Sequence, residues 1–257
     1  MIAGRPAAVA VPEPVRQLAG DAPVTAVWRN ELGGLTFRVG DARYVKWSPH
    51  NAGIDLSREA ARLAWAGQWL PVPRVLDRGS DATASWLVTA ALPGRSAVDE
   101  HWLGRPAEAA ARVGAALRLL HDTLPVAECP FSWSAGDRIG RARGYDEAWW
   151  RAGAERHPAA AGRSKAELLE LLAAVPPVDR LVVCHGDACV PNVLLEPAGF
   201  VDLGSLGVAD RWADLAVCSW SLEWNHGPGH QEAFFAGYRI EPDPERIGYY
   251  RLLWDLS

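Results

Sequence analysis

Hydrophobic residues change their spacing part-way along this chain. Between residues 24 and 90 they fall in short runs typical of β-strands: 24–29, 35–40, 42–47, 74–78 and 85–90. One helix is predicted among these runs, with Ser57 as its N-cap and an end near Trp69, just before a Pro-Val-Pro sequence. Ala90–Gly94 is interpreted as a connector, because strand-type spacing stops there and helical spacing begins.

The remainder of the chain predicts helices. Apolar residues recur at three- and four-residue intervals over 106–122, 167–175, 209–224 and 244–256. Residues 1–23 carry four prolines and are expected to form a loose N-terminal segment. This order of elements predicts an α+β fold of two lobes with a cleft between them. We expect a β-rich N-terminal lobe over 1–91 and a mainly helical C-terminal lobe over 92–257.

Composition and charge narrow the class of protein. The 257 residues are 49% hydrophobic and 22% charged. With a net charge of −5, the chain lacks the excess of basic residues that is typical of nucleic-acid-binding proteins. No stretch approaches the roughly 18 apolar residues of a membrane span, and Met1–Val11 is too short for a secretory signal. We expect a cytoplasmic protein with neither nucleic acid nor membrane as partner. Its four cysteines form no CxxC pair, which favours buried thiols over a zinc site.

Three polar residues stand out in the segment 181–204. Asp187, Asn192 and Asp202 are separated by short apolar runs, by Pro191 and by a turn-like sequence at 196–199. A carboxylate on a loop, an amide five residues on and a second carboxylate across a hairpin would converge on one point. That set suits phosphoryl transfer, in which one Asp orients the attacking hydroxyl while the Asn and the second Asp hold Mg²⁺ on the phosphates.

A lysine in one of the predicted strands is a second feature that suggests phosphate binding. Lys46 is one of only two lysines among 26 basic residues, and it lies inside a predicted strand. A compact ammonium group can reach a phosphate from a crowded strand. Glu59, in the first turn of the following helix, either favours the helix dipole or pairs with Lys46 to aim it at nucleotide phosphates. Gly33-Gly34, in the turn 31–34, joins two strands; a simple hairpin turn is favoured over a backbone that lies over phosphates.

The order of these features carries a resemblance. Lys46, Glu59, His185-Gly186-Asp187, Asn192 and the sequence VDLG at 201–204 follow one another as in a kinase fold. The chain resembles the aminoglycoside phosphotransferases, especially the 3′-phosphotransferase branch, over 70–76, 117–131, 185–192, 209–216 and the tail around 247–256. The resemblance implies a protein-kinase-like two-lobe fold, a Mg²⁺ requirement and ATP or GTP as the phosphate donor.

The resemblance also implies roles for single residues. Asp187 would be the catalytic residue that accepts or orients the proton of the substrate hydroxyl, and Asn192 and Asp202 would bind the metal. Nucleotide binding would fall to a further set of residues: Lys46 on the phosphates, Glu59 holding it, and the backbone of Ala90 and Leu92 at the purine. Asp214 is expected to anchor the backbone of the catalytic loop, and His185 to be a structural support.

The acceptor region departs from the family pattern. Aminoglycosides are polycations, so carboxylates should surround them. The expected substrate loop 137–156 has four acidic residues and five arginines. After Ala216, Glu223 is the only acidic residue in the predicted helix 209–224. Tryptophans occur instead, at 149, 150, 220, 224 and 254; they either pack in the core or form an apolar acceptor pocket. The candidate substrate residues are Asp146, Arg211, Trp220, Glu223, Trp224 and Asp255.

The leading interpretation is therefore an antibiotic O-phosphotransferase acting on a sugar hydroxyl of an aminoglycoside-like small molecule. One alternative is the same chemistry on a less cationic nucleoside antibiotic of the capuramycin type, and another is a metabolic small-molecule kinase, for example for an amino alcohol. A non-catalytic nucleotide-binding module is disfavoured because Lys46, Asp187, Asn192 and Asp202 are all present. The chain is expected to be a monomer or a homodimer.

Overall fold

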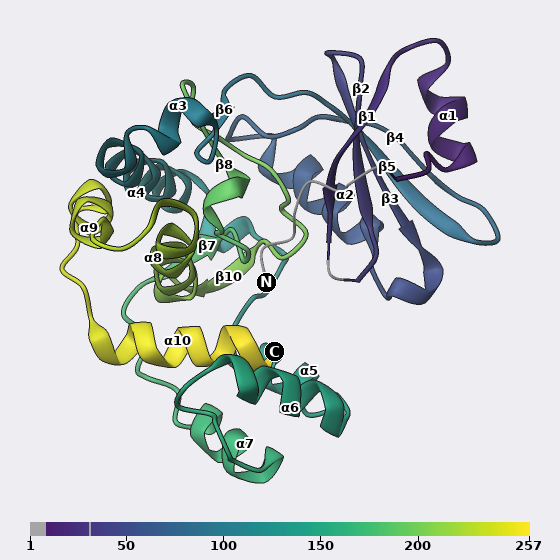
Figure 1. Ribbon diagram of the computed structural model, residues 1–257. Helices are drawn as coiled ribbons and strands as arrows, with labels where there is room; N and C mark the ends of the chain where they lie inside the picture. The colour runs from purple at the N-terminus through teal and green to yellow at the C-terminus, as the bar shows by residue number, and fades with distance from the viewer. Residues whose placement is uncertain (1–8, 31) are drawn as a thin grey trace. The chain divides into compact units, whose positions relative to one another are not determined.

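The computed structural model describes residues 9–30 and 32–257 and divides the chain into two compact units (Figure 1). The first unit runs to Pro93 and includes Gly199–Gly204, so the segment that carries Asp202 belongs to it. The second unit comprises Gly94–Ala198 and Ser205–Ser257. One unit is built on a sheet and the other mainly on helices, so the fold is α+β and of the two-lobed kinase type.

The first unit is built on a five-stranded antiparallel sheet with the strand order β1-β2-β3-β5-β4. The strands are β1 (Val24–Arg29), β2 (Leu35–Val39), β3 (Arg43–Pro49), β4 (Val75–Ser80) and β5 (Ala84–Ala90). Lys46 lies in the middle of β3, opposite Thr36 of β2 and Leu87 of β5. A central strand is paired on both sides, so Lys46 has a rigid backbone.

Two helices cover opposite faces of this sheet. Val15 of α1 (Glu13–Ala19) shares a hydrophobic core with Phe37 and Val45. Side chains alternate along a strand, so Lys46 faces away from this core. The helix α2 (Leu56–Ala66) packs against β5 and carries the buried Glu59. The alternation of β3 therefore decides that Lys46 points toward α2 rather than α1.

The first unit corrects two expectations. Residues 13–19 form α1 inside the segment expected to be loose, of which residues 1–8 lie outside the described part. Helix α2 is capped by Asp55, whose side chain accepts from the backbone N–H of Ser57, and it ends at Ala66. The expected turn 31–34 includes residue 31, outside the described part; Asn30 Oδ1 accepts the N–H groups of Leu32 and Gly34.

The second unit is mainly helical. Its helices are α3 (Glu100–Leu103), α4 (Pro106–Thr123), α5 (Ala135–Ala142), α6 (Glu147–Arg156), α7 (Lys165–Ala173), α8 (Trp212–His226), α9 (Gln231–Tyr238) and α10 (Pro244–Leu256). Its short strands are β6 (Arg95–Ser96), β7 (Leu181–Cys184), β8 (Val193–Leu195) and β10 (Gly207–Asp210), while β9 (Gly199–Phe200) belongs to the first unit. Strand β7 pairs with β10 and β6 with β8, both antiparallel.

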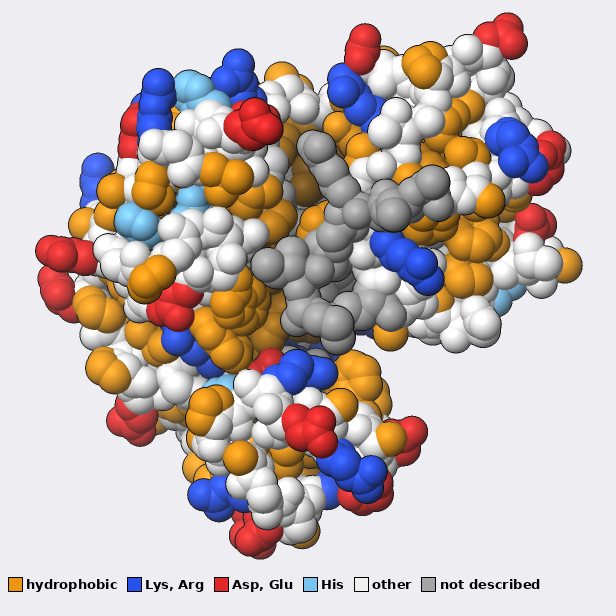
Figure 2. All heavy atoms as spheres, in the orientation of Figure 1, with side chains coloured by type: hydrophobic (Ala, Val, Ile, Leu, Met, Phe, Trp, Pro, Cys, Tyr) orange, Lys and Arg blue, Asp and Glu red, His pale blue; other side chains and the backbone are white. Residues whose placement is uncertain are grey.

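The four helices predicted from spacing are confirmed as α4, α7, α8 and α10. Helix α7 begins at Lys165, after a capping box formed by Ser164 and Glu167. The expected substrate loop 137–156 is instead mostly the helices α5 and α6. Within residues 9–30 and 32–257, no helix has both the length and the apolar character that a membrane crossing requires. Acidic and basic side chains are interspersed over the visible face (Figure 2).

Helices α4 and α9 pack at very short range because each has a glycine at the contact. A Cβ atom at Gly114 would lie 2.1 Å from the carbonyl oxygen of Phe234, and one at Gly237 would lie 2.1 Å from that of Ala111. Real Cβ atoms do not approach backbone so closely, so any side chain would push the helices apart. Helix α4 carries His121, and its position therefore depends on these glycines.

We predict that Gly114→Ala destabilises the fold by about 2 kcal/mol or more, because the added methyl group overpacks a backbone contact. Gly140→Ala is the matched control, since nothing lies within 4 Å of its added Cβ in helix α5. That control should stabilise the fold by about 0.5 kcal/mol through helix propensity. Urea-unfolding midpoints measure both; equal midpoints for the two variants would refute the close packing of α4 on α9.

Candidate active site

Lys46 lies between two carboxylates of the first unit. Its Nζ donates to Oε1 and Oε2 of Glu59 at 2.6 and 2.8 Å and is 2.9 Å from Oδ1 of Asp202. Burial by itself lowers the pKa of Lys46, but the charges of Asp202 and Glu59 outweigh it and raise that pKa above its ordinary value. Lys46 is therefore a fixed cation at neutral pH.

Local structure positions both of its partners. Glu59 is 5% exposed and lies in the first turn of α2, where the helix dipole also favours its charge. Asp202 follows β9 with a φ of 62°, a left-handed conformation that few non-glycine residues adopt. Such a backbone persists where surrounding contacts fix it, and the ion pair with Lys46 supplies one.

The connector residues Ala90 and Leu92 lie at the end of the same unit. The N–H of Ala90 donates to the carbonyl oxygen of Arg74 at 2.9 Å, and the next N–H, of Ala91, donates to Ala42 at 2.8 Å. The backbone contact of Ala90 to a nucleotide would therefore have to use its carbonyl oxygen. The side chain of Leu92 lies against Gly199.

The loop after β7 carries His185, Gly186 and Asp187. Gly186 has a φ of +81°, and a Cβ there would lie 2.1 Å from the carbonyl oxygen of Ser205, so only glycine fits. The backbone N–H of Asp187 donates to Nδ1 of His185 at 3.2 Å, and Nδ2 of Asn192 donates to the backbone oxygen of Asp187 at 3.0 Å. Asp187 therefore lies on a turn that is fixed on both sides.

The side chain of Asp214 binds the backbone of this turn. Its Oδ2 accepts the backbone N–H of His185 at 2.6 Å and its Oδ1 accepts that of Gly186 at 2.9 Å, which confirms the expected anchoring. Nε2 of His121 lies 3.0 Å from Oδ2, and Nδ1 of His121 lies 2.8 Å from the hydroxyl of Tyr238. Burial would raise the pKa of Asp214, but these partners lower it below its ordinary value.

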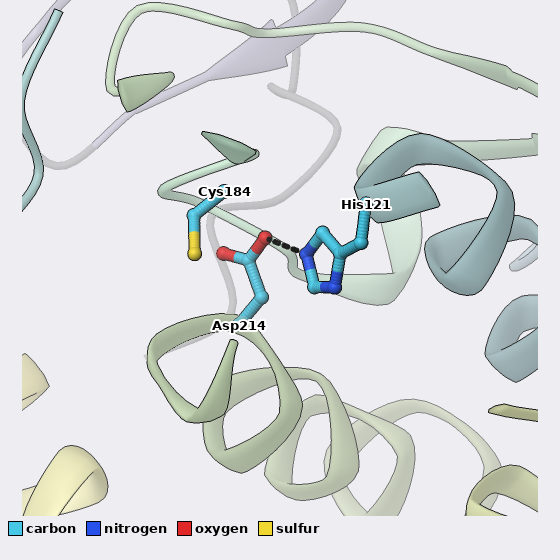
Figure 3. A group of neighbouring side chains, drawn as sticks. All are labelled: His121, Cys184 and Asp214. Atoms are coloured by element: carbon cyan, nitrogen blue, oxygen red, sulfur yellow. Dashed lines mark hydrogen bonds and ion pairs between the residues drawn. The ribbon is translucent and has the colours of Figure 1, made fainter. Parts of the chain in front are cut away.

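Figure 3 shows His121, Cys184 and Asp214 pointing toward one another from α4, β7 and α8. Their potential ligand atoms lie within 4.8 Å of one another, and all three residues are buried. Burial raises the pKa of the Cys184 thiol well above its ordinary value, and that thiol donates to the backbone oxygen of Asp210. The carboxylate of Asp214 is occupied by the loop and by His121, so we interpret this cluster as support for the turn.

Asn192 and Asp202 are the expected metal ligands, and each is described within its own unit. The amide nitrogen of Asn192 donates to Asp187, so its side-chain oxygen is the atom that would bind a cation. Asp202 supplies carboxylate oxygens. Each of these side chains offers oxygen donors, which Mg²⁺ prefers and soft metals do not.

Comparisons with known proteins show the family of this chain. The model of the phosphotransferase enzyme family matches residues 7–250. The chain belongs to this family. It is a phosphotransferase, and the resemblance drawn from the sequence is confirmed.

Its relatives include both 3′ and 3″ enzymes. The chain is 39% identical over 227 residues to an aminoglycoside 3′-phosphotransferase of Streptomyces fradiae, covering 82% of this chain and 83% of that one. It is 37% identical over 257 residues to a streptomycin 3″-kinase of Streptomyces griseus, covering 88% and 89%. The aminoglycoside phosphotransferase APH(3'')-Id of Streptomyces rimosus, in complex with ADP and streptomycin, has a TM-score of 0.73 at 32% identity, covering 94% and 95%.

Three of the candidate acceptor residues of this phosphotransferase lie together near the end of α8. The rings of Trp220 and Trp224 are 4.8 Å apart, and the guanidinium of Arg251 from α10 lies 5.4 Å from the centre of the Trp220 ring. Arg251 is also 4.0 Å from the carboxylate of Glu223. His157 contacts Trp220 edge-on, and burial, with Arg251 adding to it, lowers the pKa of this histidine.

The other candidates lie apart from this group or have structural partners. Asp146 is the N-cap of α6, accepting the N–H of Trp149. Arg211 pairs with Asp179 at 2.7 Å just before α8, roughly 20 Å along the helix from Trp224 at 1.5 Å per residue. Asp255 is 7% exposed, and Nε of Arg156 is 3.8 Å from its Oδ1.

The sequence analysis did not identify several residues that lie in or beside the candidate site. His121 and Tyr238 support Asp214 from α4 and α9, and Arg251 joins the tryptophans from α10. His121 could have been found from the sequence, because it is a polar residue on the apolar face of the predicted helix 106–122. Arg251 carried no such signal, because its partner is 31 residues away in the sequence and is reached only through packing of α10 on α8.

Asp255 gives a prediction with a definite sign. Burial raises its pKa from 3.8 to about 6, although Arg156 opposes the shift. A raised carboxyl pKa destabilises the fold once the group ionises, so the penalty is absent well below pH 4 and complete above about pH 6. Asp255→Asn should therefore raise the free energy of unfolding by about 3 kcal/mol at pH 8, and by about half of that at pH 5.

Urea unfolding of both proteins at the two pH values measures this gain. Glu241→Gln changes an exposed acid in the same way and is the matched control. An equal gain at pH 5 and pH 8 would show that Asp255 is not held with a raised pKa.

Proposed function

We propose that this phosphotransferase moves the γ-phosphate of ATP or GTP to a sugar hydroxyl of an aminoglycoside-like antibiotic, with Mg²⁺ as cofactor. The observation that carries the proposal is the fixed Lys46 cation between Glu59 and Asp202. A lysine held by a glutamate is the arrangement by which kinases bring an ammonium group to nucleotide phosphates. The ADP and streptomycin in the Streptomyces rimosus enzyme support the same class of donor and acceptor.

In the proposed reaction, the acceptor oxygen forms a bond to the γ-phosphorus while the bond to the bridging oxygen of the β-phosphate breaks. Asp187 orients the hydroxyl and takes its proton, and Lys46 binds the phosphates. Asn192 and Asp202 would hold Mg²⁺, whose charge neutralises the phosphate oxygens when it is bound. Such catalysis is mostly positioning and charge neutralisation, which suits a turn as tightly held as 185–187.

We predict that Asp187→Ala lowers turnover by about 10²-fold or more, because the hydroxyl loses the group that orients it and takes its proton. Nucleotide binding should remain close to wild type, since Lys46 and Asp202 lie in the other unit. Steady-state transfer kinetics and nucleotide titration measure the two quantities. Undiminished turnover would remove Asp187 from the catalytic role.

The acceptor region favours a second candidate, a less cationic nucleoside antibiotic of the capuramycin type. Trp220 and Trp224 offer flat apolar surfaces, while the one acid of this part of α8, Glu223, is already close to Arg251. Such a surface suits stacking on a planar base better than pairing with several ammonium groups. Aminoglycosides remain the first candidate, because relatives at 37–39% identity are named for them.

A panel of kanamycin, streptomycin and a capuramycin-type nucleoside decides between the two. We expect turnover of at least one aminoglycoside, because the relatives at 37–39% identity are named for these substrates. ADP and GDP release, scored with each nucleotide in turn, also gives the donor preference. Turnover of the nucleoside alone would transfer the assignment to the second candidate.

A metabolic small-molecule kinase uses the same chemistry and is separated by a growth test. If the chain is a resistance enzyme, a sensitive host that expresses it should grow in the presence of the antibiotic. Protection should disappear with Asp187→Ala. Transfer to an amino alcohol without any protection would favour the metabolic role.

A further inference from the structure

A buried tyrosine lies on the far side of the histidine that contacts Asp214. Tyr238 is the last residue of α9, and it is fully buried. Its hydroxyl lies 2.8 Å from Nδ1 of His121, while Nε2 of the same ring lies 3.0 Å from Oδ2 of Asp214. The three side chains therefore form one row inside the second unit, with the histidine in the middle.

The hydroxyl of Tyr238 is held in place by the close packing of α9 on α4. A Cβ atom at Gly114 of α4 would lie 2.8 Å from the backbone nitrogen of Tyr238, so the two backbones are in contact. Arg118, one turn further along α4, donates to the backbone oxygen of Tyr238 at 3.2 Å. His121 lies on the same helix. The tyrosine and the histidine therefore meet on backbone that is fixed on both sides.

The protons on the His121 ring follow from its two neighbours. Burial would raise the pKa of Asp214, but its partners lower it, so this carboxylate only accepts and Nε2 must carry a proton. Burial raises the pKa of Tyr238 to about 12, so its hydroxyl keeps its proton at neutral pH. The structure gives this hydroxyl one acceptor among the described residues, Nδ1 of His121. A neutral ring that accepts from Tyr238 and donates to Asp214 satisfies all three groups.

We propose that Tyr238 is a positioning residue of this phosphotransferase: its hydroxyl fixes the tautomer and the orientation of the His121 ring that donates to Asp214. This inference rests on the proposed function, in which the turn bound by Asp214 presents Asp187 to the acceptor hydroxyl. Without Tyr238, Nδ1 would lose its donor and would become a costly buried acceptor. The ring relieves that cost by turning or by moving its proton to Nδ1, and either change takes the Nε2–H group away from Asp214.

The loss of this donor would reach the catalytic turn through a single atom. Oδ2 of Asp214, which receives Nε2–H, also accepts the backbone N–H of His185 at 2.6 Å. In the other tautomer Nε2 would be an acceptor, and two acceptors 3.0 Å apart repel each other. A carboxylate that turns away from the ring weakens its hydrogen bond to the turn. Asp187 would then spend less time in the orientation that takes the proton of the substrate hydroxyl.

The first test is Tyr238→Phe, which removes the hydroxyl and keeps the ring. The turnover number kcat should fall about tenfold, while KM for nucleotide and for antibiotic stays within about twofold, because the binding groups are untouched. Tyr249→Phe is the matched control: the Tyr249 hydroxyl donates to the backbone oxygen of Leu172 at 2.8 Å and lies outside the row. Both variants should melt at similarly lowered temperatures, but the control should keep wild-type kcat.

Nuclear magnetic resonance provides readouts that do not depend on activity. In the wild type, spectra of the ring nitrogens of His121 should show a protonated Nε2 and an unprotonated Nδ1. The backbone amides of His185 and Gly186, which donate to Asp214, should exchange with solvent about tenfold faster in Tyr238→Phe. In Tyr249→Phe they should exchange as in the wild type.

A double variant tests whether Tyr238 acts through the histidine. His121→Gln supplies an amide N–H that can donate to Asp214 but has no ring whose tautomer a hydroxyl could fix. In that background Tyr238→Phe should change kcat by less than about twofold. An undiminished tenfold loss there would show that Tyr238 acts by another route and would overturn the inference.

The outcomes separate this inference from the proposed function. A protonated Nδ1 with an unprotonated Nε2 in the wild type would overturn the positioning role. So would wild-type kcat or unchanged amide exchange in Tyr238→Phe, an equal loss of kcat in Tyr249→Phe, or a rise in KM without a fall in kcat. Each of these results leaves Asp187 catalytic. Wild-type kcat in Asp187→Ala would instead overturn the proposed function itself.

Discussion

The turn that carries Asp187 depends on the buried carboxylate of Asp214. It is fully buried, and an ionised carboxylate in that position is costly unless it accepts hydrogen bonds from several donors. Two of these donors are the backbone N–H groups of His185 and Gly186, and a third partner is the ring of His121. The need to satisfy one buried charge therefore shapes the backbone that presents Asp187, and it ties α4, α8 and β7 to one place.

In the first unit, the charge that must be compensated is positive. The ammonium group of Lys46 is compensated by the buried carboxylate of Glu59 and by the half-exposed carboxylate of Asp202. Glu59 comes from a helix and Lys46 from a central strand, both rigid elements. Each unit thus contributes one part of the proposed chemistry already in a fixed orientation, which is what phosphoryl transfer asks of a protein.

Much of the site could be predicted because it rests on short-range order. The alternation of β3 and the first turn of α2 are local, and they place Lys46 near Glu59. Helix α1 was not expected, because the four prolines of residues 1–23 were interpreted as signs of a loose segment, whereas Pro14 stands in the first turn, where a proline is tolerated. The side-chain partners of Asp214 and of Trp220 could not be predicted, in contrast to the backbone groups that Asp214 anchors: His121 lies 93 residues from Asp214, and only tertiary packing brings them together.

The central claim is that this chain transfers the γ-phosphate of a nucleotide to a hydroxyl of an antibiotic. In this account Asp187 orients the hydroxyl, and Asp214 holds the turn that carries Asp187. Mass spectrometry of the antibiotic after incubation with enzyme, Mg²⁺ and nucleotide tests it most directly, with Asp214→Asn beside the wild type. We predict that the antibiotic gains the mass of one phosphoryl group with the wild type and does so far more slowly with Asp214→Asn. Nucleotide hydrolysis without any phosphorylated antibiotic, or equal product from both proteins, would contradict the account.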